Sequence, residues 1–299
     1  MPMPALVTEM TEINNDLKGD NKLWSSSDSK KYFPVSNTYN TLPPDVYEPH
    51  ILEGGVFFER LNFNTESLIQ FEDSSIDKVI TEISSFWNHK ERFKEFGFPY
   101  KRGILLWGPP GSGKSCAIKL IIEKVIMLGG VGVRFDDPWA FIYGMRALRQ
   151  IEPETPVVVI MEDLDAIMTA NPESLILNTL DGIDGFENIV YLATTNYPEE
   201  LEGRIKNRPS RFDRRFHIGF PNEKSRMIYI KHLQDKIKDS KIDINRWVKD
   251  TEKFTLAHIK ELFISVVLFE HSYEDALSDL IEMRKKIKSQ DDDGKAGFQ

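Results

Sequence analysis

The feature that most restricts what this 299-residue chain can fold into is a glycine-rich run between an apolar strand and a helix. The run is Gly108-Pro109-Pro110-Gly111-Ser112-Gly113-Lys114-Ser115, and the largely apolar residues 103–107 precede it directly. Residues 114–128 follow with the apolar spacing of a helix, which Gly129-Gly130 would end. Chance produces such a match in roughly 1% of chains of this length, since glycine makes up about 7% of residues. The sequence therefore predicts a phosphate-binding loop.

The residue types in this loop suit a bound nucleotide. Glycines let backbone N–H groups close around a polyphosphate at the positive end of a helix dipole. Lys114 is predicted to reach the β- and γ-phosphates of ATP, and Ser115 to offer its hydroxyl to Mg²⁺. The next residue, Cys116, is expected to bring its backbone N–H to the α-phosphate. We predict that residues 108–116 bind ATP together with Mg²⁺.

A second polar group follows the apolar run 157–161. This run ends in Glu162-Asp163-Leu164-Asp165, and ligands bind at the carboxyl ends of parallel strands. One acid would hold Mg²⁺, usually through water, and the other would orient or deprotonate the attacking water. We assign magnesium binding and catalysis to Glu162 and Asp163, with Asp163 as the base. For Asp165 we favour a helix N-cap, which acids after strands often form.

Asn196 and a cluster of arginines lie farther along the chain. Asn196 follows the apolar run 189–194, and it either acts on the attacking water and the γ-phosphate or is a turn residue before Pro198. Five arginines then occur within a dozen residues, at positions 204, 208, 211, 214 and 215. They form either a solvated basic loop or the source of an arginine finger, a cation inserted into a neighbour's γ-phosphate site.

The order of apolar runs indicates the domain organisation. Strand-like and helical runs alternate up to residue 220, which predicts a parallel sheet with crossover helices, and only helices are expected after it. The predicted units are a weakly ordered N-terminal arm (1–55), an α/β domain (56–220), a helical domain (221–288) and a disordered tail (289–299). The arm is either a simple tail or a partner-binding segment.

Three aromatic residues follow Asp136-Asp137-Pro138 at alternating positions, namely Trp139, Phe141 and Tyr143. Alternating aromatics could grip an extended polypeptide in a pore. Trp139 and Tyr143, four residues apart, could instead pack one face of a helix. We favour packing in the core.

The order of these motifs resembles the AAA ATPases. The P-loop and the strand ending in acids are followed by Leu180-Asp181-Gly182, Ala193-Thr-Thr-Asn196 and Arg208-Pro-Ser-Arg211-Phe-Asp213, and the resemblance covers about residues 61–285. It implies a five-stranded parallel α/β domain with a helical lid, assembled as a hexamer or heptamer. Two arginines spaced as Arg208 and Arg211 act in that family on the adjacent subunit's nucleotide, so the resemblance implies a catalytic role in trans for both.

The residues Phe98 to Leu106 and the Glu-Asp order resemble the branch that contains the mitochondrial Rieske-protein translocase. The chain also departs from the family pattern. Most members have Asp-Glu in place of Glu162-Asp163, so the predicted base is one methylene shorter than usual. Many have Gly-Ala-Asp in place of Leu256-Ala257-His258, so a lid contact to the nucleotide does not carry over.

Composition narrows the function classes. A net charge of −9 argues against charge-driven binding to nucleic acid. The single cysteine excludes a disulfide within the chain, and the histidines lack zinc-like spacing. No apolar run approaches the ~18–20 residues of a membrane span, and no secretory signal is present, so we predict a cytoplasmic protein without membrane contact.

These features predict an ATP-hydrolysing AAA motor or remodelling factor. It is expected to act as a homo-oligomeric ring on a protein partner. One alternative is a nucleic-acid loader or packaging-type motor. The other is an ATP-dependent binding switch with little turnover.

Overall fold

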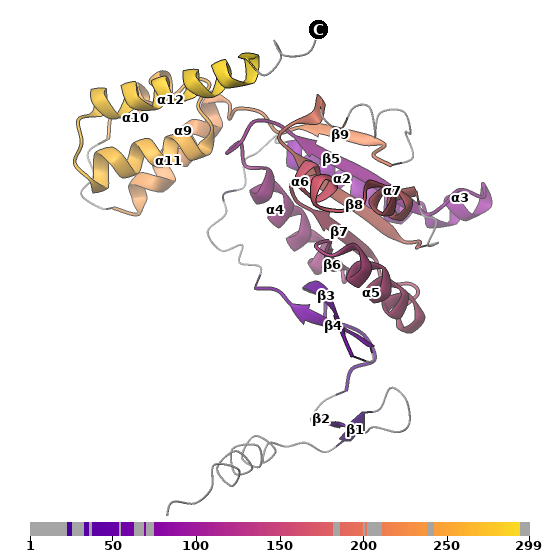
Figure 1. Ribbon diagram of the computed structural model, residues 1–299. Helices are drawn as coiled ribbons and strands as arrows, with labels where there is room; N and C mark the ends of the chain where they lie inside the picture. Colours follow the sequence, from indigo (N-terminus) through magenta and orange to yellow (C-terminus); the bar gives the residue numbers. More distant parts are fainter. Residues whose placement is uncertain are drawn as a thin grey trace, which may run out of the picture.

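Figure 1 shows the computed structural model of the chain. It describes residues 23–25, 33–35, 38–53, 55–62, 69, 75–181, 186–199, 201, 211–237 and 242–293. β1 (Leu23–Ser25) and β2 (Phe33–Val35) form a separate two-stranded antiparallel sheet. Most of the predicted N-terminal arm before residue 38, and the predicted tail from residue 294, lie outside the described residues.

A seven-stranded sheet forms the centre of the α/β domain, in the order β4-β3-β6-β7-β8-β5-β9 (Figure 1). Its strands are β3 (Val46–Leu52), β4 (Gly55–Arg60), β5 (Lys101–Trp107), β6 (Val131–Arg134), β7 (Val157–Met161), β8 (Ile189–Thr195) and β9 (Arg214–His217). All neighbours pair in parallel except β3 and β4. The predicted parallel α/β sheet is confirmed, with seven strands in place of five.

β3 comes from the segment that we assigned to the N-terminal arm, and β4 begins at the last residue of that segment. β3 and β4 form an antiparallel hairpin, and β3 extends the sheet by pairing with β6 at Val46 and Tyr47, both of which are buried. The predicted domain boundary after residue 55 is therefore wrong. Glu, Pro and His interrupt the apolar pattern of β3, so only its pairing with a distant strand reveals it as part of the sheet.

The arginine-rich segment also contains a strand that we did not predict. Arg214 and Arg215 lie in β9, which pairs with β5 at one edge of the sheet, and both side chains are exposed. Charged side chains are common on edge strands, where they prevent pairing with other chains. This part of the segment is therefore an edge strand and not a loop.

Helices cover both faces of the sheet, as its parallel strands require. α2 (Ser75–Asn88) and α4 (Lys114–Met127) pack on one face, with side chains such as Ile83, Ile104 and Ile118 in their core. α5 (Pro138–Ile151), α6 (Leu164–Ala170) and α7 (Glu173–Asp181) contribute to the core on the other face. α3 (Lys90–Glu95) is a short helix without buried residues.

The remaining helices form a lid with its own hydrophobic core. They are α9 (Glu223–Asp235), α10 (Ile244–Asp250), α11 (Leu256–Phe263), the π-helix η1 (Ile264–Leu268) and α12 (Tyr273–Asp293). Trp247, Phe254 and Leu262 are among the residues buried in this core. The predicted helical lid after the sheet is confirmed. α12 continues to Asp293, so the tail begins later than the predicted residue 289.

Helix α5 corrects the prediction for its aromatic residues. Phe141 is fully buried, whereas 54% of Trp139 and 50% of Tyr143 is exposed, with Arg146 lying over the Tyr143 ring. The helical spacing was right, but these two side chains lie on the outer face of the helix. Periodicity identifies a shared face without showing which face meets the sheet. Within the described part of the chain, no helix combines the length and apolar character needed to span a bilayer.

The close contact between β5 and Arg211 of the arginine cluster gives a testable stability prediction. A Cβ atom at Gly103 would lie 1.8 Å from the carbonyl oxygen of Arg211, a backbone atom that cannot move aside easily. Gly103→Ala should therefore lower the free energy of unfolding by about 2 kcal/mol or more in denaturant titrations, as overpacking does. Gly55→Ala in β4 is the control, because a Cβ there meets nothing within 4 Å. Equal stability of the two variants would contradict the close contact between Gly103 and the Arg211 backbone.

Candidate nucleotide-binding site

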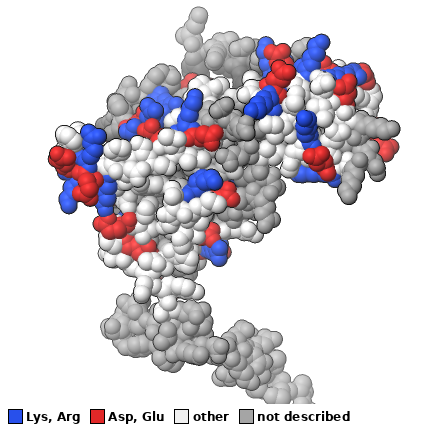
Figure 2. Space-filling view, turned by 180° about the vertical axis from the view of Figure 1, so that it is seen from behind, with Lys and Arg blue, Asp and Glu red and all other residues white. Residues whose placement is uncertain are grey.

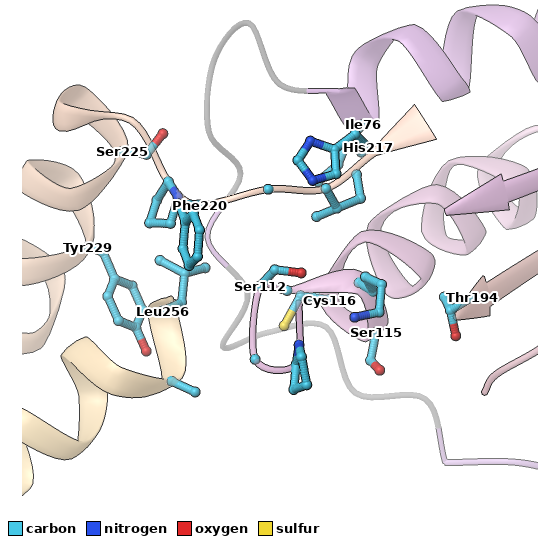
Figure 3. A pocket seen from close by; sticks show the side chains of 18 of the residues that line it. Ile76, Ser112, Ser115, Cys116, Thr194, His217, Phe220, Ser225, Tyr229 and Leu256 are labelled. Carbon is cyan, nitrogen blue, oxygen red and sulfur yellow. The ribbon is translucent and has the colours of Figure 1, made fainter. Parts of the chain in front are cut away.

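A cavity of about 720 Å³ lies between the α/β domain and the lid. Figure 3 shows it from close by, with the glycine-rich loop in the middle and lid residues such as Tyr229 on one side. The α/β domain lines it with residues 110–116 of the loop and with side chains at the ends of neighbouring strands, namely Asp163, Thr194, Asn196 and His217. The lid contributes Tyr229, Leu256, Ala257 and Lys260. The structure thus brings the predicted P-loop, one acid and the asparagine into one site.

The loop has the backbone geometry that a phosphate cradle needs. Gly108, Gly111 and Gly113 have φ angles of 156°, 72° and 102°, which residues with a side chain rarely adopt. A Cβ at Gly108 would lie 2.1 Å from the carbonyl oxygen of Ile218, so close packing requires glycine there as well. The hydroxyl of Ser112 is buried in the loop without a hydrogen-bond partner. These observations fit a loop shaped around an anionic ligand.

Lys114 is held inside the site by oxygen atoms. Its Nζ donates to the carbonyl oxygens of Gly108 at 2.8 Å and Pro109 at 3.1 Å, and to Oδ1 of Asn196 at 2.5 Å. Burial lowers the pKa of Lys114, while the nearby carboxylates of Asp163 and Asp165 raise it. The ammonium group is thus placed beside Asn196, as expected for two residues that act on the same phosphate.

The two predicted acids differ in position. Both side chains are exposed, but Asp163 lines the cavity and Glu162 is not among the lining residues. Asp163 has φ 50° and ψ 60°, a left-handed conformation that costs about 1–3 kcal/mol for a residue with a side chain. Its backbone N–H donates to the hydroxyl of Thr194 at 3.0 Å. This arrangement favours Asp163 as the acid closer to the nucleotide.

Asp165 does not cap helix α6 as we predicted. Asp163 occupies the N-cap position, and its side chain makes no cap hydrogen bond. Asp165 lies in the first turn of the helix, where Oδ1 accepts a hydrogen bond from the Thr195 hydroxyl at 2.7 Å. The left-handed turn at Asp163 starts the helix two residues earlier than the sequence pattern suggested.

Of the two arginines predicted to act as arginine fingers, the structure describes only Arg211. Arg208 lies outside the described residues. Arg211 is 5% exposed, and Nε and Nη2 donate to the two carboxylate oxygens of Asp181 at 2.8 and 2.9 Å. Removing one partner of such a buried pair is costly, because the other charge then stays buried and uncompensated. Arg211 is therefore held within its own subunit and does not line the cavity.

The lid contacts the loop directly, which the sequence did not predict. Ala257 N–H donates to the carbonyl oxygen of Gly111 at 3.4 Å, and a Cβ at Gly111 would lie 2.7 Å from the Ala257 Cβ. Thr255 caps α11 by accepting from the His258 N–H, and its hydroxyl also bonds His258 Nδ1 at 2.6 Å. Thr255 is the type of residue that starts a helix, so the sequence could have located the start of α11 but not its contact with the loop.

Tyr229 faces the loop from α9. Burial raises the pKa of its hydroxyl, and the neighbouring Cys116 raises it further. Figure 3 shows the Cys116 sulfur directed toward the lid side of the cavity. No sequence motif marks Tyr229, because its place in the site depends on how the lid docks.

Cys116 offers a direct test of this geometry, since it is exposed, lines the cavity and is the only cysteine in the chain. At about ten times its dissociation constant, a nucleotide leaves roughly one site in eleven empty. ATP with Mg²⁺ should therefore slow maleimide labelling of Cys116 about tenfold, measured by mass spectrometry. The Lys114→Ala variant is the control and should show little protection. Equal labelling rates with and without nucleotide in the unmodified chain would place the nucleotide elsewhere.

Comparisons with known proteins agree with this site. The family model described as ATPase family associated with various cellular activities (AAA) matches residues 104–220. The ATP-dependent zinc metalloprotease FtsH 2 of Thermoanaerobacter sp. (strain X514) is 28% identical over 73% of this chain and 48% of the relative. FtsH 3 of Symbiobacterium thermophilum is 29% identical over 81% of this chain and 41% of the relative. ATPase family gene 2 protein of Schizosaccharomyces pombe is 29% identical over 58% of this chain.

The chain thus spans half or less of the length of these curated relatives. They support the AAA family but not the narrower Rieske-protein translocase branch that we predicted. The glycine-rich loop, the acid and the asparagine all lie inside the matched region. Residues 104–220 thus match the AAA ATPase family, and this match supports ATP with Mg²⁺ as the cofactors and ATP hydrolysis as the reaction.

Proposed function

We propose that the chain is a ring-forming ATP-driven motor that remodels a protein partner. The observation that carries this proposal is the composition of the cavity wall, which comes from both the α/β domain and the lid. The two parts meet at the hydrogen bond between Ala257 and Gly111 of the phosphate loop. A nucleotide in this cavity would touch both, so its binding and loss would change how the lid sits. Such a coupling converts ATP turnover into movement.

Within the site, each polar residue has a proposed task. Lys114 binds the β- and γ-phosphates, and Asn196 lies beside its ammonium group at the γ-phosphate end. Asp163 orients the attacking water and accepts its proton. Ser115, with Glu162 and Asp163 as carboxylate partners, would hold Mg²⁺, which supplies positive charge to the phosphate oxygens. Asp163 lines the cavity and Glu162 does not, which supports Asp163 as the base.

We propose a ring because the proposed role of the arginines requires an adjacent subunit. Arg208 and Arg211 are proposed to act on the nucleotide of the adjacent subunit in a hexamer or heptamer. For Arg211 this requires release from Asp181, because the pair holds the guanidinium inside its own subunit. Contact with a neighbour's nucleotide would then replace one anionic partner by another, which limits the cost of breaking the pair.

A protein partner fits the surface better than a nucleic acid does. Figure 2 shows Lys and Arg mixed with Asp and Glu over one face, and the described residues of this face form no continuous basic area. The chain carries a net charge of −9. The exposed Trp139 and Tyr143 on α5 offer aromatic surface to a polypeptide. Relatives named metalloproteases have polypeptide substrates by definition. We propose a cytoplasmic site of action.

The base assignment can be tested by Asp163→Asn, which keeps the shape of the side chain but removes its charge. ATP should still bind with nearly normal affinity, and turnover should fall by ~10²–10⁴ because a positioned base is lost. Calorimetry and phosphate release measure the two quantities. Asp136→Asn, on an exposed carboxylate beyond β6, is the matched control and should keep full activity. Full turnover by Asp163→Asn would move the role to another residue, first to Glu162.

The ring can be tested by mixing two inactive variants. Lys114→Ala subunits keep their arginines, and Arg211→Ala subunits keep their phosphate loop. Arginine fingers contribute ~10³–10⁵ to turnover in other ATPases, so mixed rings should regain measurable activity where the two kinds adjoin. Sedimentation must show that mixed rings form. Rings that form and stay inactive would contradict complementation in trans, and a fully active Arg211→Ala variant would leave Arg211 only its pair with Asp181.

A further inference from the structure

The last residues of β8 contain a positioning residue, Thr194, to which the sequence analysis assigned no role. We propose that Thr194 acts on ATP hydrolysis through Asp163, because its hydroxyl fixes the backbone that directs the Asp163 carboxylate into the nucleotide cavity. This inference rests on the proposed role of Asp163 as the base. Thr194 lines the same cavity and is 2% exposed. Figure 3 shows it at the end of its strand, on the same side of the cavity as Ser115.

The pairing of β7 with β8 explains the contact. Met161 and Ala193 are the last paired residues of the two strands. Beyond this point β7 leaves the sheet at Glu162, while β8 continues for two residues beside β5. Thr194 therefore stands next to the departing backbone without a strand partner on that side. Its hydroxyl accepts the hydrogen bond from Asp163 N–H at 3.0 Å in place of a backbone carbonyl.

The hydrogen bond from Asp163 N–H to the Thr194 hydroxyl fixes the N–H group of Asp163, a residue in the left-handed conformation. The carbonyl oxygen of Asp163 accepts from the N–H groups of Ala166 at 2.9 Å and Ile167 at 3.1 Å, so helix α6 fixes that side. Thr194 fixes the N–H side. With both sides held, φ stays at 50°, and the carboxylate makes no cap bond to α6 and lies at the cavity instead. Without the hydroxyl, Asp163 could relax to the extended conformation usual for an N-cap and turn its carboxylate toward the helix.

The neighbouring threonine has a different task. The Thr195 hydroxyl donates to Asp165 Oδ1 at 2.7 Å and accepts from Tyr197 N–H at 3.0 Å. Successive side chains of a strand point to opposite faces, so the two hydroxyls cannot replace each other. Thr195 anchors the first turn of α6, and Thr194 alone of the two contacts Asp163.

The test is Thr194→Val, which has nearly the same shape but lacks the oxygen. We expect the turnover number to fall about tenfold to a hundredfold, because small displacements of a catalytic group have effects of this size. Affinity for ATP should change by less than about threefold, since Thr194 does not act on the phosphates. Thr194→Ser restores a hydroxyl and should recover most of the turnover. Thr194→Ala, which also lacks the oxygen, serves if the valine variant does not fold.

A matched control distinguishes the proposed positioning of Asp163 from a loss of stability caused by removing any buried hydroxyl. Thr179 is also buried, and its hydroxyl donates only within α7, to the carbonyl oxygen of Leu175 at 3.0 Å. Thr179→Val should therefore leave turnover unchanged even if it lowers the melting temperature. Two outcomes would overturn the proposal. One is that Thr179→Val, at a similar loss of stability, loses as much turnover as Thr194→Val. The other is that Thr194→Ser does not recover turnover.

A double-mutant cycle tests whether Thr194 acts through Asp163. In an Asp163→Asn background, Thr194→Val should change single-turnover hydrolysis by less than about twofold, because residues that act as a unit are not additive. Two independent, multiplying losses would overturn the proposal. The outcomes also separate the two assignments: an inactive Asp163→Asn with a fully active Thr194→Val defeats only the positioning role, whereas a fully active Asp163→Asn defeats both.

Discussion

The parallel pairing of β5 with β8 is the constraint on which the candidate site depends. It runs from Lys101 opposite Ile189 to Trp107 opposite Thr195. Trp107 directly precedes the phosphate loop and Thr195 directly precedes Asn196, so this register brings the loop beside the asparagine. The hydrogen bond from Lys114 to Asn196 is the result. A slip of one residue would turn each of these side chains to the other face of the sheet.

Asp163 reaches the site in the same way, through the parallel pairing of β7 with the other side of β8. β7 ends one pair after Ile160 meets Leu192, and the chain turns through the left-handed Asp163 into α6. Three adjacent strands thus deliver a cation, an acid and an amide to one edge of the sheet, as parallel α/β folds do for ligands. Burial of the Lys114 ammonium is offset by carbonyl oxygens and by the two nearby carboxylates. A nucleotide would replace part of this set with phosphate oxygens.

The lid completes the site and connects it to the rest of the chain. Its hydrophobic core is separate from the two cores around the sheet, and the proposed movement of the lid as a unit would leave all three cores intact. The hydrogen bond from Ala257 to Gly111 connects the lid to the phosphate loop. Outside the cavity, Arg211 forms a buried ion pair with Asp181. Both features give ATP binding a mechanical consequence in the proposed ring.

The sequence by itself determined the parts of the site that are local in the chain: the glycine spacing of the loop, Lys114, the acids after β7 and Asn196 after β8. Each follows from a run of neighbouring residues whose conformation they largely set themselves. Only the tertiary structure decided which acid faces the cavity, that β3 and β9 join the sheet, that Arg211 is buried, and that Thr194 and the lid complete the site. These depend on contacts between distant segments, which strand register and packing create and which no local pattern encodes.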